Sequence, residues 1–176
     1  FRMRHEPVNN TKDFYLTPED EDRLLKVCND KYRLLFRFTI LTGLRLAEVL
    51  SVSADDIQQQ QSNDGGSVGV LRVVGKGSKL RRVPLTPEAR QILESQGSWS
   101  HLKRYTVQRY MQRAALKVGL PCTFHTLRHT TASRLAAAGA NVMHIKDLLG
   151  HTSLTTTQNY MHLAPGWGDE VVALIR

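Results

Sequence analysis

The spacing of apolar positions along the chain predicts a mostly helical protein. The segments 17–19 and 86–88 both read threonine, proline, glutamate. Each predicts the start of a helix of about ten residues, because threonine caps the first free amides and proline fits the first turn. Residues 32–41 are apolar enough to form a buried helix, which Gly43 is expected to end. A further short helix is predicted over residues 45–50.

One small antiparallel sheet is predicted in the middle of the chain. Residues 68–74 and 80–85 are rich in β-branched and apolar side chains, and the segment GKGSK between them predicts a hairpin with a basic tip. The polar segment 58–67, QQQQSNDGGS, is expected to be a loop. From Thr106 onward the pattern is helical again. The predicted fold class is therefore α+β, mainly α-helical with a small antiparallel β-sheet.

Length and composition indicate one domain. The chain has 176 residues, of which 41% are hydrophobic, and this is enough for a core. No apolar run approaches the roughly 20 residues that span a bilayer, and the N-terminus does not resemble a signal peptide. Only Cys28 and Cys122 are present, which excludes a disulfide framework and favours a reducing compartment such as the cytoplasm. Residues 1–15 lack periodicity and are expected to be a linker, with the domain at 16–176.

The charge of the chain favours an anionic partner. Lysine and arginine number 24 against 16 acidic residues, so the formal net charge is +8, which is typical of proteins that bind nucleic acid. Residues 72–82 hold several basic residues and no acidic one. In a second basic stretch Arg109, Arg113 and Lys117 recur every four residues and so share one helix face. That face is suited to follow the phosphate backbone of DNA.

Candidate chemistry gathers in a few short motifs. In HTLRH, 125–129, the first histidine and the arginine are three residues apart and would project from the same helix face. The segment LGH, 149–151, places another histidine directly after a glycine, and Tyr160 follows nine residues later. Far upstream, TGLR, 42–45, ends in an arginine with Glu48 one helical turn beyond it.

Together these motifs resemble the tyrosine recombinases, also called phage integrases. The matching segments, in the family's order and at family-like separations, are TGLRLAE (42–48), VVGKGSKLRRVPL (73–85), HTLRH (125–129) and LGHTSLTTTQNY (149–160). The resemblance implies a catalytic domain that cleaves and rejoins DNA through a 3′-phosphotyrosine intermediate. It also implies that residues 1–15 are the linker from an N-terminal DNA-binding domain that this chain lacks.

The resemblance assigns roles to individual residues. The catalytic residues that it implies are Arg45, Lys76, His125, Arg128, His151 and Tyr160. Glu48 would support the site. The residues expected to bind DNA are Lys79, Arg81, Arg82, Arg109 and Arg113. The implied partner is double-stranded DNA, bound by a homo-tetramer on paired sites, and the alternative for the fragment in solution is a monomer. Neither a cofactor nor a membrane is implied.

Phosphodiester chemistry accounts for these residue types. Two arginines can each donate forked hydrogen bonds to the non-bridging oxygens of a phosphate. A tyrosine hydroxyl has a pKa near 10 and needs a proton acceptor, which His125 could be. The leaving 5′ oxygen needs a proton, which Lys76 on the hairpin could deliver. The phosphotyrosine bond conserves energy, so rejoining would need neither ATP nor a divalent metal.

Other interpretations stay open at this point. Lys79 competes with Lys76 as the proton donor, and the spacing of His125 and His129 also fits a metal site. A structural role is favoured for His129. A type IB-like topoisomerase and a DNA-binding module that has lost its chemistry are alternative functions. Residues 169–175 predict a tail helix that packs either on its own core or on a neighbouring protomer.

Overall fold

The computed structural model describes residues 14–61, 66–75, 77, 79–151 and 153–165. The elements that it describes are α1 (Pro18–Lys26), α2 (Asp30–Thr42), α3 (Leu46–Val49), η1 (Ala54–Asp56), β1 (Ile57–Gln61), β2 (Ser67–Val74), β3 (Leu80–Pro84), α4 (Pro87–Gln96), α5 (Arg104–Val118), α6 (Phe124–Ala137), α7 (Val142–Leu149), α8 (Thr155–Gln158) and η3 (Met161–Leu163). This content confirms the predicted fold class, a mainly helical domain with one small antiparallel sheet.

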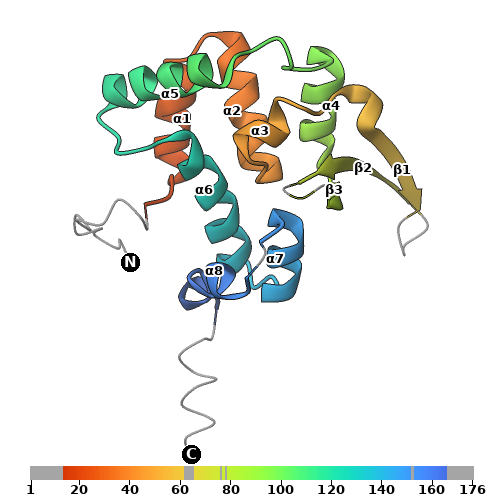
Figure 1. Cartoon of the computed structure of the whole chain (residues 1–176). Coiled ribbons are helices and arrows are strands. Elements are labelled where there is room, and N and C mark those ends of the chain that lie inside the picture. The colour runs from red at the N-terminus through yellow and green to blue at the C-terminus, as the bar shows by residue number, and fades with distance from the viewer. Residues whose placement is uncertain (1–13, 62–65, 76, 78, 152, 166–176) are drawn as a thin grey trace, which may run out of the picture.

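Helix α2 runs through the centre of the core. It packs against α1, α4 and α6, and Figure 1 shows it between α1 and α5 on one side and α4 on the other. Phe36 and Phe38 are fully buried, and because they are two residues apart they point to opposite sides of the helix. Phe36 meets Phe124 edge to face at 6.0 Å, and Phe38 lies 5.1 Å from Trp99 between ring centroids. Helix α2 is therefore anchored on two sides.

The helix boundaries confirm the local patterns in the sequence. The Thr17 hydroxyl accepts a hydrogen bond from the Asp20 amide at 3.1 Å, and the Thr86 hydroxyl accepts one from the Ala89 amide at 3.2 Å. Both threonines therefore cap their helices as predicted. Helix α2 ends at Gly43, whose φ of 66° is the left-handed conformation that glycine adopts most readily.

The sheet has three antiparallel strands in the order β1-β2-β3. The hairpin β2–β3 was predicted, and Val74 pairs with Leu80 at its end. The prediction of a loop over residues 58–67 was wrong for residues 58–61, which belong to β1, where Gln58 pairs with Val70, and for Ser67, which begins β2. Residues 62–65 lie outside the described residues. The glutamines of β1 are exposed. Four consecutive glutamines carry no apolar alternation, so the pattern missed this strand.

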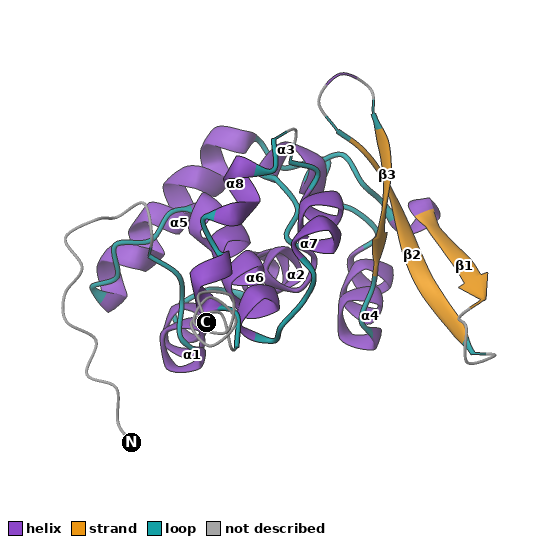
Figure 2. Ribbon diagram, turned by 90° about the horizontal axis from the view of Figure 1, so that it is seen from below, coloured by secondary structure: helices purple, strands orange, loops and turns teal. Residues whose placement is uncertain are grey.

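A second, smaller apolar cluster joins α7 and Tyr160 to α6. It consists of Ala132, Ala136, Ile145, Leu149 and Tyr160. The two alanines of α6 pack with Ile145 and Leu149 of α7. Helix α7 contacts α6 on one side and β3 on the other, and Figure 2 shows it between them. The hairpin, α6 and the segment that follows α7 are thereby brought together.

Parts of both termini lie outside the described residues. These parts are residues 1–13, most of the predicted linker, and the predicted tail helix 169–175.

In the interior, Cys28 and Cys122 are both free and buried, and burial raises the pKa of each thiol to about 11. Within the described ranges no helix is long and apolar enough to cross a membrane.

Candidate active site

Arg45 precedes α3 and directs its guanidinium toward the C-terminal end of α7. A Cβ on Gly43 would lie 2.5 Å from Leu149 Cδ2, so glycine is what lets the end of α2 pack this closely on α7. Arg45 Nη2 donates to the Gly150 carbonyl at 2.9 Å, and Nη1 donates to the Leu149 carbonyl at 3.3 Å. The Arg45 side chain remains 39% exposed and is accessible to a ligand.

Arg128 reaches the same place from α6 and is buried. Its Nη1 donates to the Gly43 carbonyl and its Nη2 to the Leu149 carbonyl, both at 2.7 Å. Burial, together with the nearby charge of Arg45, lowers the pKa of Arg128 to about 9. The guanidinium still carries its charge at neutral pH. The two arginines of the sequence motifs therefore converge on one backbone oxygen.

Glu48 lies behind Arg45 and is 5% exposed. Its Oε2 accepts from the Arg45 amide at 2.8 Å, and its Oε1 accepts from Arg45 Nη1 at 3.1 Å. Arg81 adds a two-pronged contact, with both nitrogen–oxygen distances at 2.8 Å. Burial alone would raise the pKa of Glu48, but the hydrogen bonds and charges of the two arginines hold this pKa below its ordinary value. The carboxylate is thus ionised and fixed.

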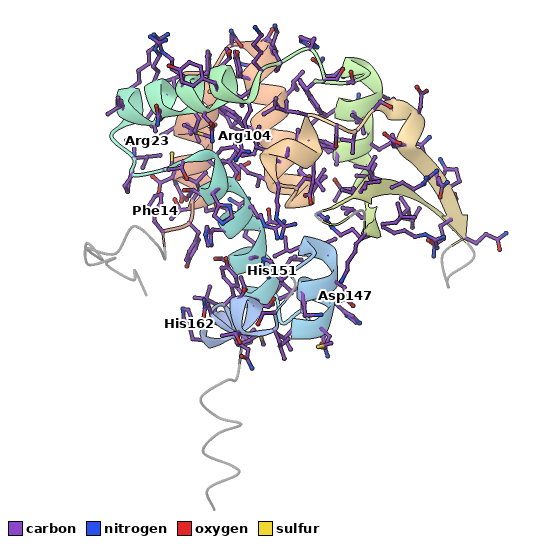
Figure 3. The ribbon with its side chains drawn as sticks, in the orientation of Figure 1. Phe14, Arg23, Arg104, Asp147, His151 and His162 are labelled. Atoms are coloured by element: carbon purple, nitrogen blue, oxygen red, sulfur yellow. The ribbon has the colours of Figure 1, made fainter. Side chains whose placement is uncertain are left out.

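Two of the predicted histidines lie at this site. His151 follows Gly150, the residue that caps α7, and Figure 3 shows it beside α6. Its Nδ1 is 2.8 Å from the Thr157 hydroxyl. Burial, then the charges of Arg128 and Arg45, lower the pKa of His151 to about 4, so its ring is neutral at neutral pH. Partial burial and the same arginines lower the pKa of His125, in the first turn of α6.

Tyr160 is 9% exposed and packs on α6 in the smaller apolar cluster. Its hydroxyl is hydrogen bonded to His129 Nδ1, and the two ring centroids are 5.7 Å apart. The His129 ring in turn meets the His125 ring edge to face at 4.6 Å. The sequence predicted a structural role for His129 and gave His125 as the proton acceptor of Tyr160. The spacing of His125 and His129 was the signal in the sequence that could have found this contact. Residues three or four positions apart share one helix face, so both histidines lie on the same face of α6 as Arg128.

The basic residues of the hairpin differ in how exposed their side chains are. Lys76 lies outside the described residues. Lys79 and Arg82 are exposed, as a DNA contact requires. Arg81 differs from the predicted surface contact. Its side chain is only 12% exposed, because its guanidinium points inward onto Glu48.

Helix α5 presents the second basic surface. Arg109 and Arg113 are both exposed, one turn apart. Arg109 lines a groove of about 610 Å³ between α5 and the start of α6, which His125 also lines. The other groove residues are Tyr105, Gln108, Met111, Gln112, Thr123 and Phe124. The groove therefore joins the exposed face of α5 to His125 at the start of α6.

No metal cluster is found within the described part of the chain. There, no group of three or more histidine, cysteine, aspartate or glutamate side chains is arranged to hold an ion. His125 and His129 contact each other edge to face rather than converging on a common point. The charge near the site is positive, which suits an anion.

Sequence comparison identifies the class of protein. Residues 15–166 match the profile of the phage integrase family. The chain therefore belongs to this family, as the motifs predicted.

Individual relatives agree with this assignment. The tyrosine recombinase XerD of Lacticaseibacillus casei is 31% identical over 161 residues, covering 75% of this chain and 50% of that protein. The tyrosine recombinase XerC of Rhizobium meliloti (strain 1021) is 36% identical over 137 residues, covering 67% of this chain and 41% of that protein. The chain thus matches half or less of the length of these relatives.

Solved structures show the same fold. The catalytic domain of bacteriophage HP1 integrase has a TM-score of 0.70 at 24% identity, and the match covers 90% of this chain and 93% of that one. The XerH site-specific recombinase bound to its difH substrate has a TM-score of 0.69 at 22% identity, covering 92% of this chain and 54% of that one. The described helices and sheet therefore have the same fold as these domains.

Proposed function

We propose that this chain is the catalytic domain of a site-specific DNA recombinase that cuts and rejoins one strand at a time. The observation that carries the proposal is the convergence of Arg45 and Arg128 on the Leu149 oxygen. Two forked donors that can share one oxygen acceptor can also share a phosphate. Tyr160 and His151 come from the segment that follows the same helix end.

In the proposed reaction the Tyr160 oxygen attacks the phosphorus of one DNA strand. A bond forms between that oxygen and the phosphorus, and the bond from the phosphorus to the 5′ oxygen breaks. Arg45 and Arg128 donate to the non-bridging oxygens, whose charge grows in the transition state. Prearranged donors of this kind are the largest catalytic contribution in many enzymes. Neutral His151 donates a further hydrogen bond.

Two proton transfers balance this step. The Tyr160 hydroxyl gives its proton to His129, which is already its hydrogen-bond partner. The proton stays on the His129 imidazole, whose ring packs edge to face against His125, until the reverse reaction returns it to Tyr160. Lys76 gives a proton to the leaving 5′ oxygen. The reverse reaction, with a 5′ hydroxyl from another strand, rejoins the DNA and releases Tyr160.

The DNA would lie along the basic surfaces of the domain. Arg109 and Arg113 on α5, with Lys79 and Arg82 on the hairpin, are exposed and would contact phosphates. Strand exchange needs paired sites, so we propose a homo-tetramer on DNA. Because the chain is similar to recombinases of bacteria and phages, we expect the protein to act in the cytoplasm of a bacterium or phage-infected host.

Trapping of a covalent adduct tests this function. Supercoiled plasmid is incubated with the protein in EDTA and resolved on a denaturing gel. We expect a protein–DNA adduct with the wild type and with Tyr15→Phe, outside the site, and none with Tyr160→Phe. A wild type that binds DNA but forms no adduct would favour a DNA-binding module without chemistry. Relaxation of a single plasmid site without exchange between sites would favour a topoisomerase.

A further inference from the structure

Arg81 makes an unusually complete set of contacts for a residue of a surface hairpin. Its Nη1 and Nη2 each donate to one oxygen of Glu48 at 2.8 Å, and its Nε donates to the Leu148 carbonyl at 3.0 Å. Only the planar fork of arginine can hold both carboxylate oxygens and a carbonyl at once. Arg81 therefore joins β3 to α3 and to the end of α7.

Glu48 also binds Arg45. It accepts from both the amide and the guanidinium of Arg45. Arg45 in turn donates to the Leu149 and Gly150 carbonyls. Arg81 and Arg45 both bind Glu48, and together they donate to three consecutive carbonyls, 148–150, at the C-terminal end of α7. Cations at this end also interact favourably with the helix dipole.

Two glycines make room for the Arg81 side chain. A Cβ on Gly150 would lie 3.0 Å from Arg81 Nη1, and a Cβ on Gly75 would lie 3.3 Å from the same atom. Gly75 immediately precedes Lys76, and Gly150 immediately precedes His151. The Arg81 guanidinium therefore packs against the backbone beside two residues with proposed catalytic roles.

We propose that Arg81 is a positioning residue of the recombinase site. It positions the Glu48 carboxylate to bind Arg45. It also fixes the hairpin, which includes Lys76, against the C-terminal end of α7, which precedes His151. Arg81 itself touches neither DNA nor the reacting atoms. This role rests on the proposed function, because it is exerted on the residues that would bind the phosphate.

The test compares Arg81→Gln and Arg81→Lys with Arg37→Gln. Arg37 is a matched control, because it also bridges carboxylates, those of Glu21 and Glu88, outside the site. The rate of adduct formation on saturating supercoiled plasmid in EDTA is measured for each variant. Plasmid affinity and the thermal midpoint are measured in parallel.

We expect Arg81→Gln to slow adduct formation by about 100-fold, the loss typical of a misplaced reacting group, with plasmid affinity unchanged. Arg81→Lys should recover little of this rate, since one ammonium cannot hold both oxygens of Glu48. Arg37→Gln should lower the thermal midpoint and leave the rate per folded molecule unchanged. Arg81→Lys keeps the charge, so it keeps the test decisive where Arg81→Gln does not fold.

A double-mutant cycle with Glu48→Gln separates positioning from other roles. If Arg81 acts through Glu48, the double variant loses far less than the product of the two single losses. Multiplying losses would overturn the proposal, as would a wild-type rate in Arg81→Gln. A weaker, less salt-dependent affinity at an unchanged rate would instead make Arg81 a residue that binds DNA. If the wild type forms no adduct at all, the proposed function fails, and the role of Arg81 fails with it.

Discussion

Arg45 and Arg128 donate to the same backbone oxygen, that of Leu149, from 3.3 Å and 2.7 Å. The two arginines are 83 residues apart in the chain. The carbonyls at the end of α7 partly offset their two positive charges. A phosphate would bring a full negative charge and several acceptor oxygens to the same donors. The arginine pair is thus already arranged around an oxygen.

Arg45→Lys tests the need for a forked donor. A lysine keeps the charge but offers a single donor point to the phosphate. We expect adduct formation to slow by about 10²–10³-fold, with little change in plasmid affinity. Rates are measured under single-turnover conditions, and Arg90→Lys, on α4, is the control. An equal loss in both variants would contradict the proposed role.

Lys76 and Lys79 can be distinguished by the leaving group. A 5′-bridging sulfur leaves without a proton, so a variant that lacks the general acid regains its rate on that substrate. We expect Lys76→Ala to be slow on the oxygen substrate and near the wild-type rate on the sulfur substrate. Lys79→Ala should treat the two substrates alike. The opposite result would move the role of general acid to Lys79.

His129→Ala tests the proton acceptor of Tyr160. The variant removes the partner of the Tyr160 hydroxyl, and we expect adduct formation to fall by about 10²–10⁴-fold. Added imidazole should restore part of the rate, because it can occupy the space left by the ring. His144→Ala, an exposed histidine on α7, is the control. An unchanged rate in His129→Ala would leave His125 as the acceptor.

His151 should make the fold less stable in acid. Folding lowers its pKa from 6.5 to about 4. Between these values the unfolded chain binds a proton that the native state does not, so stability falls as the pH falls. The lowered pKa of His125 acts in the same direction. We expect the thermal midpoint of His151→Gln to fall less than that of the wild type across this range. Parallel curves for the two proteins would contradict this prediction.

The face of α5 can be tested through salt dependence. Removing a side chain that neutralises one phosphate should reduce the slope of log affinity against log salt by about 0.9. We expect Arg109→Ala and Arg113→Ala each to lower the slope by this amount and to weaken binding to all DNA sequences. Affinities for a plasmid fragment are measured over a range of salt, beside Arg90→Ala. A slope that does not change would remove α5 from the interface.

The sequence by itself determined the local structure and the identity of the motif residues. Thr17 and Thr86 cap helices where they were expected to, and Gly43 ends α2. Such signals are readable because a cap or a turn depends on residues three or four positions away. The family motifs also pointed to Arg45 and Arg128, which the fold brings together.

Tertiary structure alone decided which side chains meet. Arg81 looked like one more surface cation in a basic hairpin, yet it pairs with Glu48, 33 residues away. His129 looked structural, yet it holds the Tyr160 hydroxyl across 31 residues. The glutamines of β1 join a sheet through backbone bonds that no side-chain pattern reports. The periodicity of a chain specifies which faces of its elements are buried. The partners across those faces depend on how α3, α6, α7 and the hairpin pack.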